Sequence, residues 1–240
     1  MKLAESVHLG VRKIGSVQVF DLVGILMGEQ MDPVIQKIEE FIQRKRLRRV
    51  ILNLQRAESI DGIALRKIIA CLIRPQRSLI FAPDGTCRDL FQTTHLPHSV
   101  KLCKNEEEVA EAFGSFLFVK DKMFQVPVDE TNPEAKNYGL ERRRNTRIRV
   151  AIPIHLVFRM KDGSELKAKG IGTNVSQGGL FAEFLDLNAP AYSKMEGLEQ
   201  SEVKITVPSN DTFKEEIVIP GKIVRFELLK KQYGIAIQFL

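Results

Sequence analysis

The sequence predicts two domains, an α/β domain followed by an all-β domain. Strand-like and helix-like segments alternate over the first half, which is typical of a small α/β domain. Residues 117–140 contain two prolines and a glycine and have no sustained hydrophobic period. From Glu141 onward, short strand-like runs follow one another without long helices between them. We therefore expect an α/β domain at 1–116, a linker at 117–140 and an all-β domain at 141–240.

The strands of the first domain are expected where β-forming residues gather between turn residues. The run VQVFDLVG is rich in such residues and closes on a glycine, and RRVILNL carries Val, Ile and Leu in succession, as a buried strand does. Two shorter runs follow. We expect strands at Val17–Gly24, Arg48–Leu54, Ser78–Ala82 and close to Val100.

Apolar periodicity and capping residues predict three helices in the same domain. Asp32 and Pro33 supply an N-cap and a first-turn proline, and an apolar stripe at helical spacing follows them. A second apolar stripe, over residues 65–73, ends before a proline. Asn105 and Glu108 have the spacing of a capping box at the start of the third helix.

Three segments within residues 7–114 resemble the STAS family, the fold of anti-anti-sigma factors and transporter tails. DLVG resembles the family's first strand, RRVILNLQRAESIDGIAL its central strand, loop and helix start, and NEEEVAEAF its final helix. The resemblance implies a surface for a protein partner. In the family an Asp is followed by a phosphorylatable Ser or Thr, but here Gly62 follows Asp61. We therefore expect no phosphorylation switch at this position, and we expect Asp61 to be the N-cap of the next helix.

The last hundred residues or so are expected to form short strands separated by turns. Such a series, without long helices, is typical of an antiparallel sandwich or barrel. In chain order the strand-like runs are VAIPIHLVFR, SELKAKGIGTNVS, GGLFAEF, VKITVP, EEIVIPGKIVRFEL and YGIAIQFL.

Two motifs in this domain carry residues suited to an anionic ligand. Arg143 and Arg147 form the pattern R-x-x-x-R within a short arginine-rich stretch, ERRRNTRIRV. Asn174, Ser176 and Gly179 form N-x-S-x-x-G further along the chain. A basic cluster implies an anionic partner such as phosphate, nucleic acid or a lipid headgroup. Each motif alone is common, and the specific signal is the presence of both in a strand-rich segment.

Together with the closing strand YGIAIQF, these motifs resemble the PilZ family from Glu141 to the end of the chain. The family's binding motifs are R-x-x-x-R and D/N-x-S-x-x-G, and the resemblance implies a β-barrel that binds the bacterial second messenger cyclic di-GMP. PilZ-like proteins commonly convert this binding into a change in motility, adhesion or secretion. We therefore expect a receptor that couples ligand binding on the barrel to a protein partner, through the first domain, in the regulation of motility or biofilm formation.

The chemistry of the ligand explains the residue types. Cyclic di-GMP offers two phosphodiester charges and guanine edges that accept hydrogen bonds at O6 and N7. Arginine suits both, because its planar fork makes paired hydrogen bonds and its face stacks on a purine. We expect Arg143 and Arg147 on phosphate and guanine, with Asn174 and Ser176 on guanine.

Three further residues complete the expected site. Gly178 and Gly179 allow positive φ and a close approach of the backbone, which a flat ligand on a barrel surface requires. Arg142 directly precedes the arginine motif, and in PilZ-like domains an additional arginine there goes with binding two stacked ligand molecules in place of one. Two stacked dinucleotides bring four phosphate charges together, which a third guanidinium would offset.

The remaining features argue against other classes of protein. No apolar stretch has the length of a bilayer span, and no secretory signal is visible, so we expect a cytoplasmic protein. Three cysteines stand sixteen residues apart without C-x-x-C, which argues against disulfides and a zinc site. We find no catalytic triad, Walker loop or dinucleotide fingerprint, and we expect neither an enzyme nor a cofactor.

Two alternatives stay open from the residues alone. The first is a protein-interaction scaffold of the anti-sigma-antagonist type, with a barrel that does not bind nucleotide. The second is a nucleic-acid binder that uses the arginine cluster. Aromatic residues interleaved with basic ones would favour the second, and residues 141–149 contain none, so we expect no nucleic-acid partner.

Overall fold

The structure is a computed structural model that describes residues 7–83, 85–121, 147–186, 194–195, 197–210, 213–227 and 233–240. It divides into two compact units, an N-terminal unit built on residues 1–109 and a C-terminal unit built mainly on residues 110–226 and 234–240. Each unit is described by itself.

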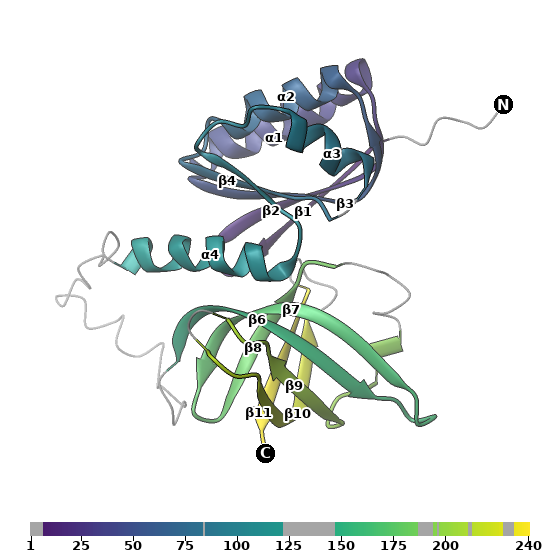
Figure 1. Cartoon of the computed structure of the whole chain (residues 1–240), viewed down its shortest axis with the longest axis vertical. Helices are drawn as coiled ribbons and strands as arrows, with labels where there is room; N and C mark the ends of the chain where they lie inside the picture. The colour runs from purple at the N-terminus through teal and green to yellow at the C-terminus, as the bar shows by residue number, and fades with distance from the viewer. Residues whose placement is uncertain are drawn as a thin grey trace, which may run out of the picture. The chain divides into compact units, whose positions relative to one another are not determined.

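The N-terminal unit is a five-stranded sheet with helices on one face, as the alternation of strand and helix signals predicted. Its elements are β1 (His8–Ile14), β2 (Val17–Leu26), the 3-10 helix η1 (Gly28–Met31), α1 (Asp32–Arg44), β3 (Arg49–Ile60), α2 (Gly62–Leu72), β4 (Arg77–Phe81), α3 (Thr86–Thr93) and β5 (Val100–Cys103). Helix α4 (Glu106–Asp121) begins in this unit and continues past its boundary at residue 109. The strands lie in the order β1-β2-β3-β4-β5; β1 is antiparallel to β2, and the following pairs are parallel. Parallel neighbours require crossover connections, which the helices supply. Helices α1, α2 and α3 lie on the same face of the sheet (Figure 1).

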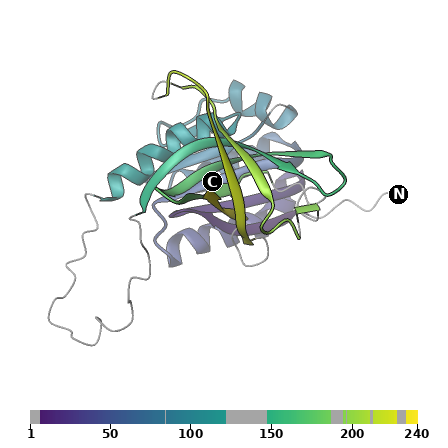
Figure 2. The same cartoon turned by 90° about the horizontal axis from the view of Figure 1, so that it is seen from below.

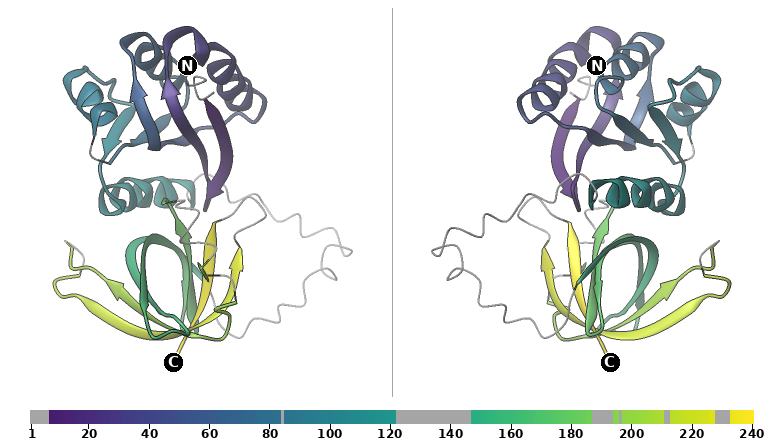
Figure 3. Two further views of the ribbon diagram at one scale, coloured as in Figure 1. Left: turned by 90° about the vertical axis from the view of Figure 1, so that its right-hand side faces the viewer. Right: turned by 90° about the vertical axis from the view of Figure 1, so that its left-hand side faces the viewer.

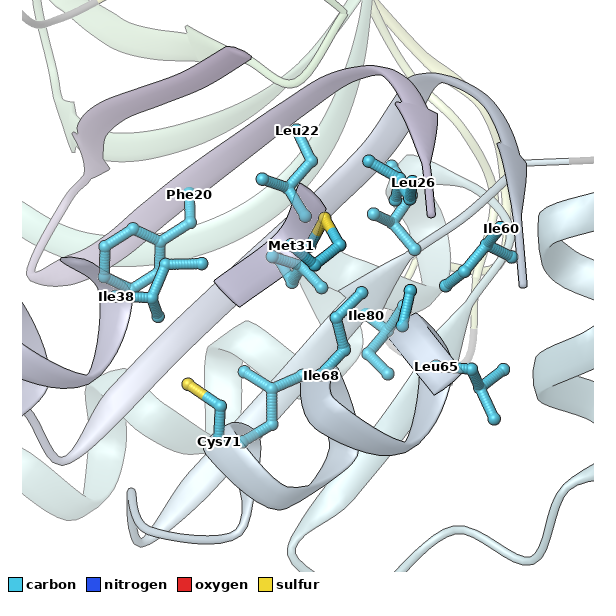
Figure 4. Packing of buried hydrophobic residues seen from close by; sticks show 14 of the residues in the cluster. Phe20, Leu22, Leu26, Met31, Ile38, Ile60, Leu65, Ile68, Cys71 and Ile80 are labelled. Carbon is cyan, nitrogen blue, oxygen red and sulfur yellow. The ribbon is translucent and has the colours of Figure 1, made fainter. Parts of the chain in front are cut away.

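Apolar side chains from the sheet and from these helices form the core of the unit (Figure 4). Phe20 of β2 packs beside Ile38 of α1, and Ile68 of α2 faces Ile80 of β4. Burying each such side chain stabilises the fold by about 1.5–3 kcal/mol. The apolar periodicity of the two predicted helices therefore marks the faces that pack on the sheet.

Two elements of this unit, β1 and α3, were missed in the sequence. Apolar and polar residues alternate only weakly in the run HLGVRKI, and β1 depends on its pairing with β2. There Arg12 Nε and Nη2 donate to the buried carboxylate of Asp21 at 2.7 and 3.0 Å, and Asn53 Nδ2 donates to the same carboxylate at 2.8 Å. Helix α3 begins without a side-chain capping bond. Both elements rely on contacts that residues distant in the sequence provide.

The predicted helix starts are partly correct. Asn105 and Glu108 form the expected capping arrangement: Asn105 Oδ1 accepts from the Glu108 amide at 2.9 Å, and Glu108 Oε2 accepts from the Lys104 amide at 2.8 Å. Asp32 is not the N-cap of α1, because η1 directly precedes the helix and Met31 takes the cap position. The Asp32 carboxylate instead forms an ion pair with Lys67 of α2.

Two elements are longer than the sequence predicted. Strand β3 continues past Leu54 to Ile60, because its second half still pairs with β2. Helix α4 continues to Asp121, five residues into the segment expected as a linker, and 122–146 lie outside the described residues. Among the residues described, no helix combines the length and the apolar character needed to cross a bilayer.

The C-terminal unit contains a closed antiparallel barrel, so of the two predicted architectures, sandwich and barrel, the barrel is observed. Its strands are β6 (Ile148–Arg159), β7 (Glu165–Ser176), β8 (Gly179–Phe184), β9 (Glu202–Val207), β10 (Ile217–Glu227) and β11 (Gly234–Phe239). Around the barrel they lie in the order β10-β11-β8-β7-β6-β9. The strands curve strongly as the sheet closes (Figures 2 and 3).

Alternate residues of each strand point into the barrel. Leu156 and Phe158 of β6, Ile205 of β9, Ala182 of β8 and Ile235 of β11 belong to one buried apolar cluster. The residues between them face outward, because successive side chains of a strand point to opposite faces. This alternation decides which polar side chains of the barrel are available to a ligand or partner.

Candidate functional site

The pairing of β6 with β7 brings the two sequence motifs together. Ile148 pairs with Val175, and Arg149 pairs with Asn174, so Arg147 at the start of β6 adjoins the last residues of β7. The antiparallel hairpin is the cause, since the first residues of one strand meet the last residues of the other.

The remainder of the arginine motif lies beyond the described part of the chain. Arg142 and Arg143 fall in the segment 122–146, so their expected place at the site stays a prediction. The structure thus brings together Arg147 and the three residues of the second motif, which all belong to the described part.

Two irregularities in the ladder lie next to Asn174. Strand β6 holds one extra residue between Arg149 and Ile152, and β7 holds one extra residue between Gly172 and Asn174 where it pairs with β8. A bulge leaves one residue without a direct partner and redirects the side chains around it. Val175 consequently packs against the barrel core, and Asn174 lies half-buried on the outer side.

The glycines of the second motif do not have positive φ, and Gly179 is needed for the packing of the barrel. Neither Gly178 nor Gly179 belongs to the described residues with positive φ, so the structure does not use the positive φ that glycine allows there. A Cβ atom at Gly179 would overlap the carbonyl oxygen of Ile237 and lie 3.2 Å from the Gln238 Cα of β11. Gly179 is therefore required because the backbone of β11 passes directly beside it.

The turn between β7 and β8 is held by two hydrogen bonds. Ser176 Oγ donates to the Gly179 carbonyl oxygen at 3.3 Å, and the Phe239 amide donates to the Gly178 carbonyl oxygen at 3.1 Å. The Ser176 bond is long for a hydroxyl donor, whose usual range ends near 3.0 Å. The hydroxyl can therefore turn to a ligand at little cost.

The polar groups of the site are available for binding. Arg147 is exposed. Within the residues described, the side chains of Arg147 and Asn174 make no hydrogen bond or ion pair. The site can thus offer a guanidinium, an amide and a hydroxyl to one ligand, a donor-rich set that suits phosphate and guanine oxygens.

A buried polar pair supports the site and was not foreseen from the sequence. Thr173 Oγ1 donates to Glu183 Oε1 at 2.8 Å, and both residues are almost fully buried. Thr173 directly precedes Asn174, so this bond to β8 fixes the bulge from which Asn174 projects. No local pattern reveals the pair, because it depends on the register of β7 and β8.

The STAS-like motif has a different environment. Asp61 Oδ1 accepts from the Ile63 and Ala64 amides at 3.0 and 2.7 Å, and its Oδ2 accepts from the Gly28 amide at 2.9 Å. The Ala64 and Gly28 bonds are the main reason that the pKa of Asp61 lies below its usual value. The expectation that Asp61 is the N-cap of α2 is confirmed. A Cβ atom at Gly62 would meet no atom within 4 Å.

The cysteines lie in the interior of the N-terminal unit. Cys71, Cys87 and Cys103 are buried and free, and burial is the main cause that raises the pKa of Cys71 to about 12. In the part of the chain that the structure describes, no three His, Cys, Asp or Glu side chains gather as metal ligands.

Comparison with known proteins relates the two units to different groups. The model of the PilZ domain matches residues 141–240. The PilZ domain with c-di-GMP of YcgR from Escherichia coli is 18% identical, with 42% of this chain and 79% of that chain aligned at a TM-score of 0.31. The PilZ domain of CeSA from a cellulose-synthesizing bacterium is 21% identical, with 40% and 80% aligned at a TM-score of 0.29.

The similar solved structures also include anti-sigma factor antagonists. An anti-sigma factor antagonist from Mycobacterium paratuberculosis is 14% identical, with 47% of this chain and 97% of that chain aligned at a TM-score of 0.41. The comparison with curated proteins gives no match. Residues 141–240 of the chain thus match the model of the PilZ domain.

Proposed function

We propose that the C-terminal barrel is a cyclic di-GMP receptor. The observation that carries the proposal is the register of β6 and β7, which sets Arg147 beside Asn174 and Ser176. The match of residues 141–240 to the PilZ domain supports it, because both binding motifs of that family are present in this segment.

Each residue has a role that follows from its chemistry. Arg143 and Arg147 bind phosphate and guanine through their planar forks. Asn174 and Ser176 bind guanine, and their outward position next to the bulge supports this role. The function proposed is binding in the cytoplasm, without catalysis.

Isothermal titration calorimetry on the full chain tests the proposal. Wild-type protein should bind cyclic di-GMP with a Kd of about 1 µM or below, and should bind neither GTP nor a DNA duplex comparably. Arg147→Ala should weaken binding roughly tenfold to a hundredfold, the value of a lost bidentate contact. Arg159→Ala is the matched control, because Arg159 is an exposed arginine at the far end of β6.

The result also separates the alternatives. If no heat of binding is measured with cyclic di-GMP, the proposal is overturned, and a protein-interaction scaffold whose barrel does not bind nucleotide is favoured. Preference for the DNA duplex would favour a nucleic-acid binder. The same titration gives the stoichiometry: we propose two ligands per barrel, reduced to one in Arg142→Leu.

We further propose that ligand binding is coupled to a protein partner through the STAS-like unit. Ile63 of α2 and Ile73, the residue that follows this helix, are each 49% exposed, and the exposed Arg66 and Ala70 lie between them on the same side of α2. Exposed isoleucines on one side of a helix can bind in the groove of a partner protein.

Crosslinking in the native cells, with cyclic di-GMP levels raised and lowered, tests the coupling. Wild type should capture a partner in a ligand-dependent manner. The capture should be lost in Ile73→Asp and retained in the control Arg44→Asp, because Arg44 is an exposed residue at the end of α1. Capture that is independent of both the ligand and Ile73 would contradict the coupling.

A further inference from the structure

The outer face of four neighbouring barrel strands carries a regular array of side chains. Residues of β7, β6, β9 and β10 that point away from the core form rows across the strands, because their partners in register share one face. The first row is Lys169, His155, Thr206 and Val218; the second is Lys167, Val157, Lys204 and Pro220. We call these eight residues the lysine face.

The row next to the lysine face balances its own charge. Arg159 lies opposite Glu165 in the register of β6 and β7, and Lys222 lies opposite Glu202 in the register of β10 and β9. Opposite charges directly across a strand pair attract each other and stabilise the sheet. This row needs no external partner to neutralise it.

The lysine face has no such balance. Lys167, Lys169 and Lys204 are exposed, and within the described chain none of them forms an ion pair. The two rows contain no carboxylate, and Glu216 lies before the start of β10, two residues before Val218. Three positive charges therefore repel one another on a surface where the adjoining row shows that acidic partners fit.

Apolar side chains stand among these lysines. Val218 of the first row is 49% exposed. Val157 lies between Lys167 and Lys204 in the second row. Cations interleaved with exposed aliphatic groups are the composition of surfaces that bind an anionic lipid layer, since the lysines meet headgroups and the apolar groups enter the interface.

We propose that the lysine face contacts the anionic headgroups of a membrane surface. The composition disfavours a protein partner, because protein interfaces are enriched in aromatic residues and Arg and depleted in Lys, and the face contains no Arg, Phe, Tyr or Trp. The face also contains no Arg, Asn or Gln, the side chains that together with Lys make paired contacts with base edges. The face lies toward the opposite end of β6 and β7 from Arg147 and Asn174.

Vesicle co-sedimentation of the full chain tests the proposal. Wild type should bind phosphatidylcholine vesicles that contain phosphatidylglycerol and should not bind vesicles of phosphatidylcholine alone. Each lysine near an anionic surface strengthens binding by about fivefold. Lys167→Gln/Lys204→Gln should therefore weaken vesicle binding by about 25-fold. Added salt should weaken the wild type as well.

A matched double variant controls for net charge. Arg159→Gln/Lys222→Gln removes the same two charges from the balanced row, and it should leave vesicle binding within about threefold of the wild-type value. Equal loss in both double variants would overturn the proposal, because binding would then follow net charge and not this face. No binding of wild type to the anionic vesicles, or stronger lysine-dependent binding to a DNA duplex, would overturn it as well.

Discussion

Asp61–Gly62 at the start of α2 and Asn174–Gly179 at the end of β7 are the two places where this chain resembles a known binding or regulatory motif. They differ in how far the fold itself uses their polar groups. Asp61 accepts three backbone hydrogen bonds. In the described chain, the Asn174 side chain accepts and donates none.

The glycines of the two motifs also differ, but here the fold depends on the glycine of the second motif and not on that of the first. Gly62 has open space where a side chain would stand, whereas Gly179 lies against the backbone of β11. A motif residue therefore reveals its role only through its surroundings. At Asp61 the surroundings use the polar group for folding, whereas at Asn174 they leave it available, as the proposed ligand site requires.

The largest effect on folding is expected from Gly179→Ala. The added methyl group would overlap the Ile237 carbonyl oxygen, and a backbone strand cannot move aside as a flexible side chain can. The barrel should lose roughly 3 kcal/mol of unfolding free energy. Urea unfolding followed by far-UV circular dichroism measures this, and a loss below about 0.5 kcal/mol would contradict the role assigned to Gly179.

The next largest effect is expected from Asp61→Ala. The change removes the N-cap of α2 and leaves the Gly28 amide without its acceptor, at a cost of about 2 kcal/mol. Asp61→Asn keeps a side-chain oxygen at the cap and should lose less. Equal unfolding midpoints for wild type and Asp61→Ala, in the same urea assay, would show that the carboxylate is not structural.

The same residue predicts a pH dependence. The folded pKa of Asp61 is lowered, first by the Ala64 amide and then by the Gly28 amide. Its contribution is therefore complete above the unfolded value, near pH 4, and is lost as the pH falls through the lower folded value. The stability difference between wild type and Asp61→Ala should shrink below about pH 4. A constant difference from neutral pH down to acid would refute this linkage.

A smaller effect of opposite sign is expected from Gly62→Ala. The position has no positive φ and has room for a methyl group. Alanine should stabilise the N-terminal unit by about 0.4–1 kcal/mol, because it restricts the unfolded chain more than glycine does. Destabilisation in thermal unfolding would mean that the backbone at Gly62 needs freedom that the described structure does not show.

The smallest effect on folding is expected from Arg147→Ala. The side chain is exposed and, in the part described, unpaired, so unfolding free energy should stay within about 0.5 kcal/mol of the wild-type value. Cyclic di-GMP affinity should nevertheless fall, as proposed above. Arg147→Lys should recover little of it, because an ammonium group cannot make the paired contact of a guanidinium. Full recovery by Lys would reduce the role of Arg147 to charge alone.

The sequence by itself determined the class of each unit and most of its elements. The apolar stripes of α1 and α2 and the capping residues Asn105 and Asp61 were visible because they depend on neighbours within a few positions. The order of strand-like runs after Glu141 indicated an all-β unit for the same reason. Arg147, Asn174 and Ser176 were identifiable as a pattern of residue types.

The tertiary structure alone decided what depends on partners distant in the chain. Strand β1 forms through its pairing with β2 and through the Arg12–Asp21 contact. The hydrophobic periodicity of the local sequence does not indicate either of them. The bulges beside Asn174 and the Thr173–Glu183 bond exist only once β7 has its register with β6 and β8. The lysine face likewise arises from cross-strand pairing, because its residues come from four separate strands and meet only when the barrel closes.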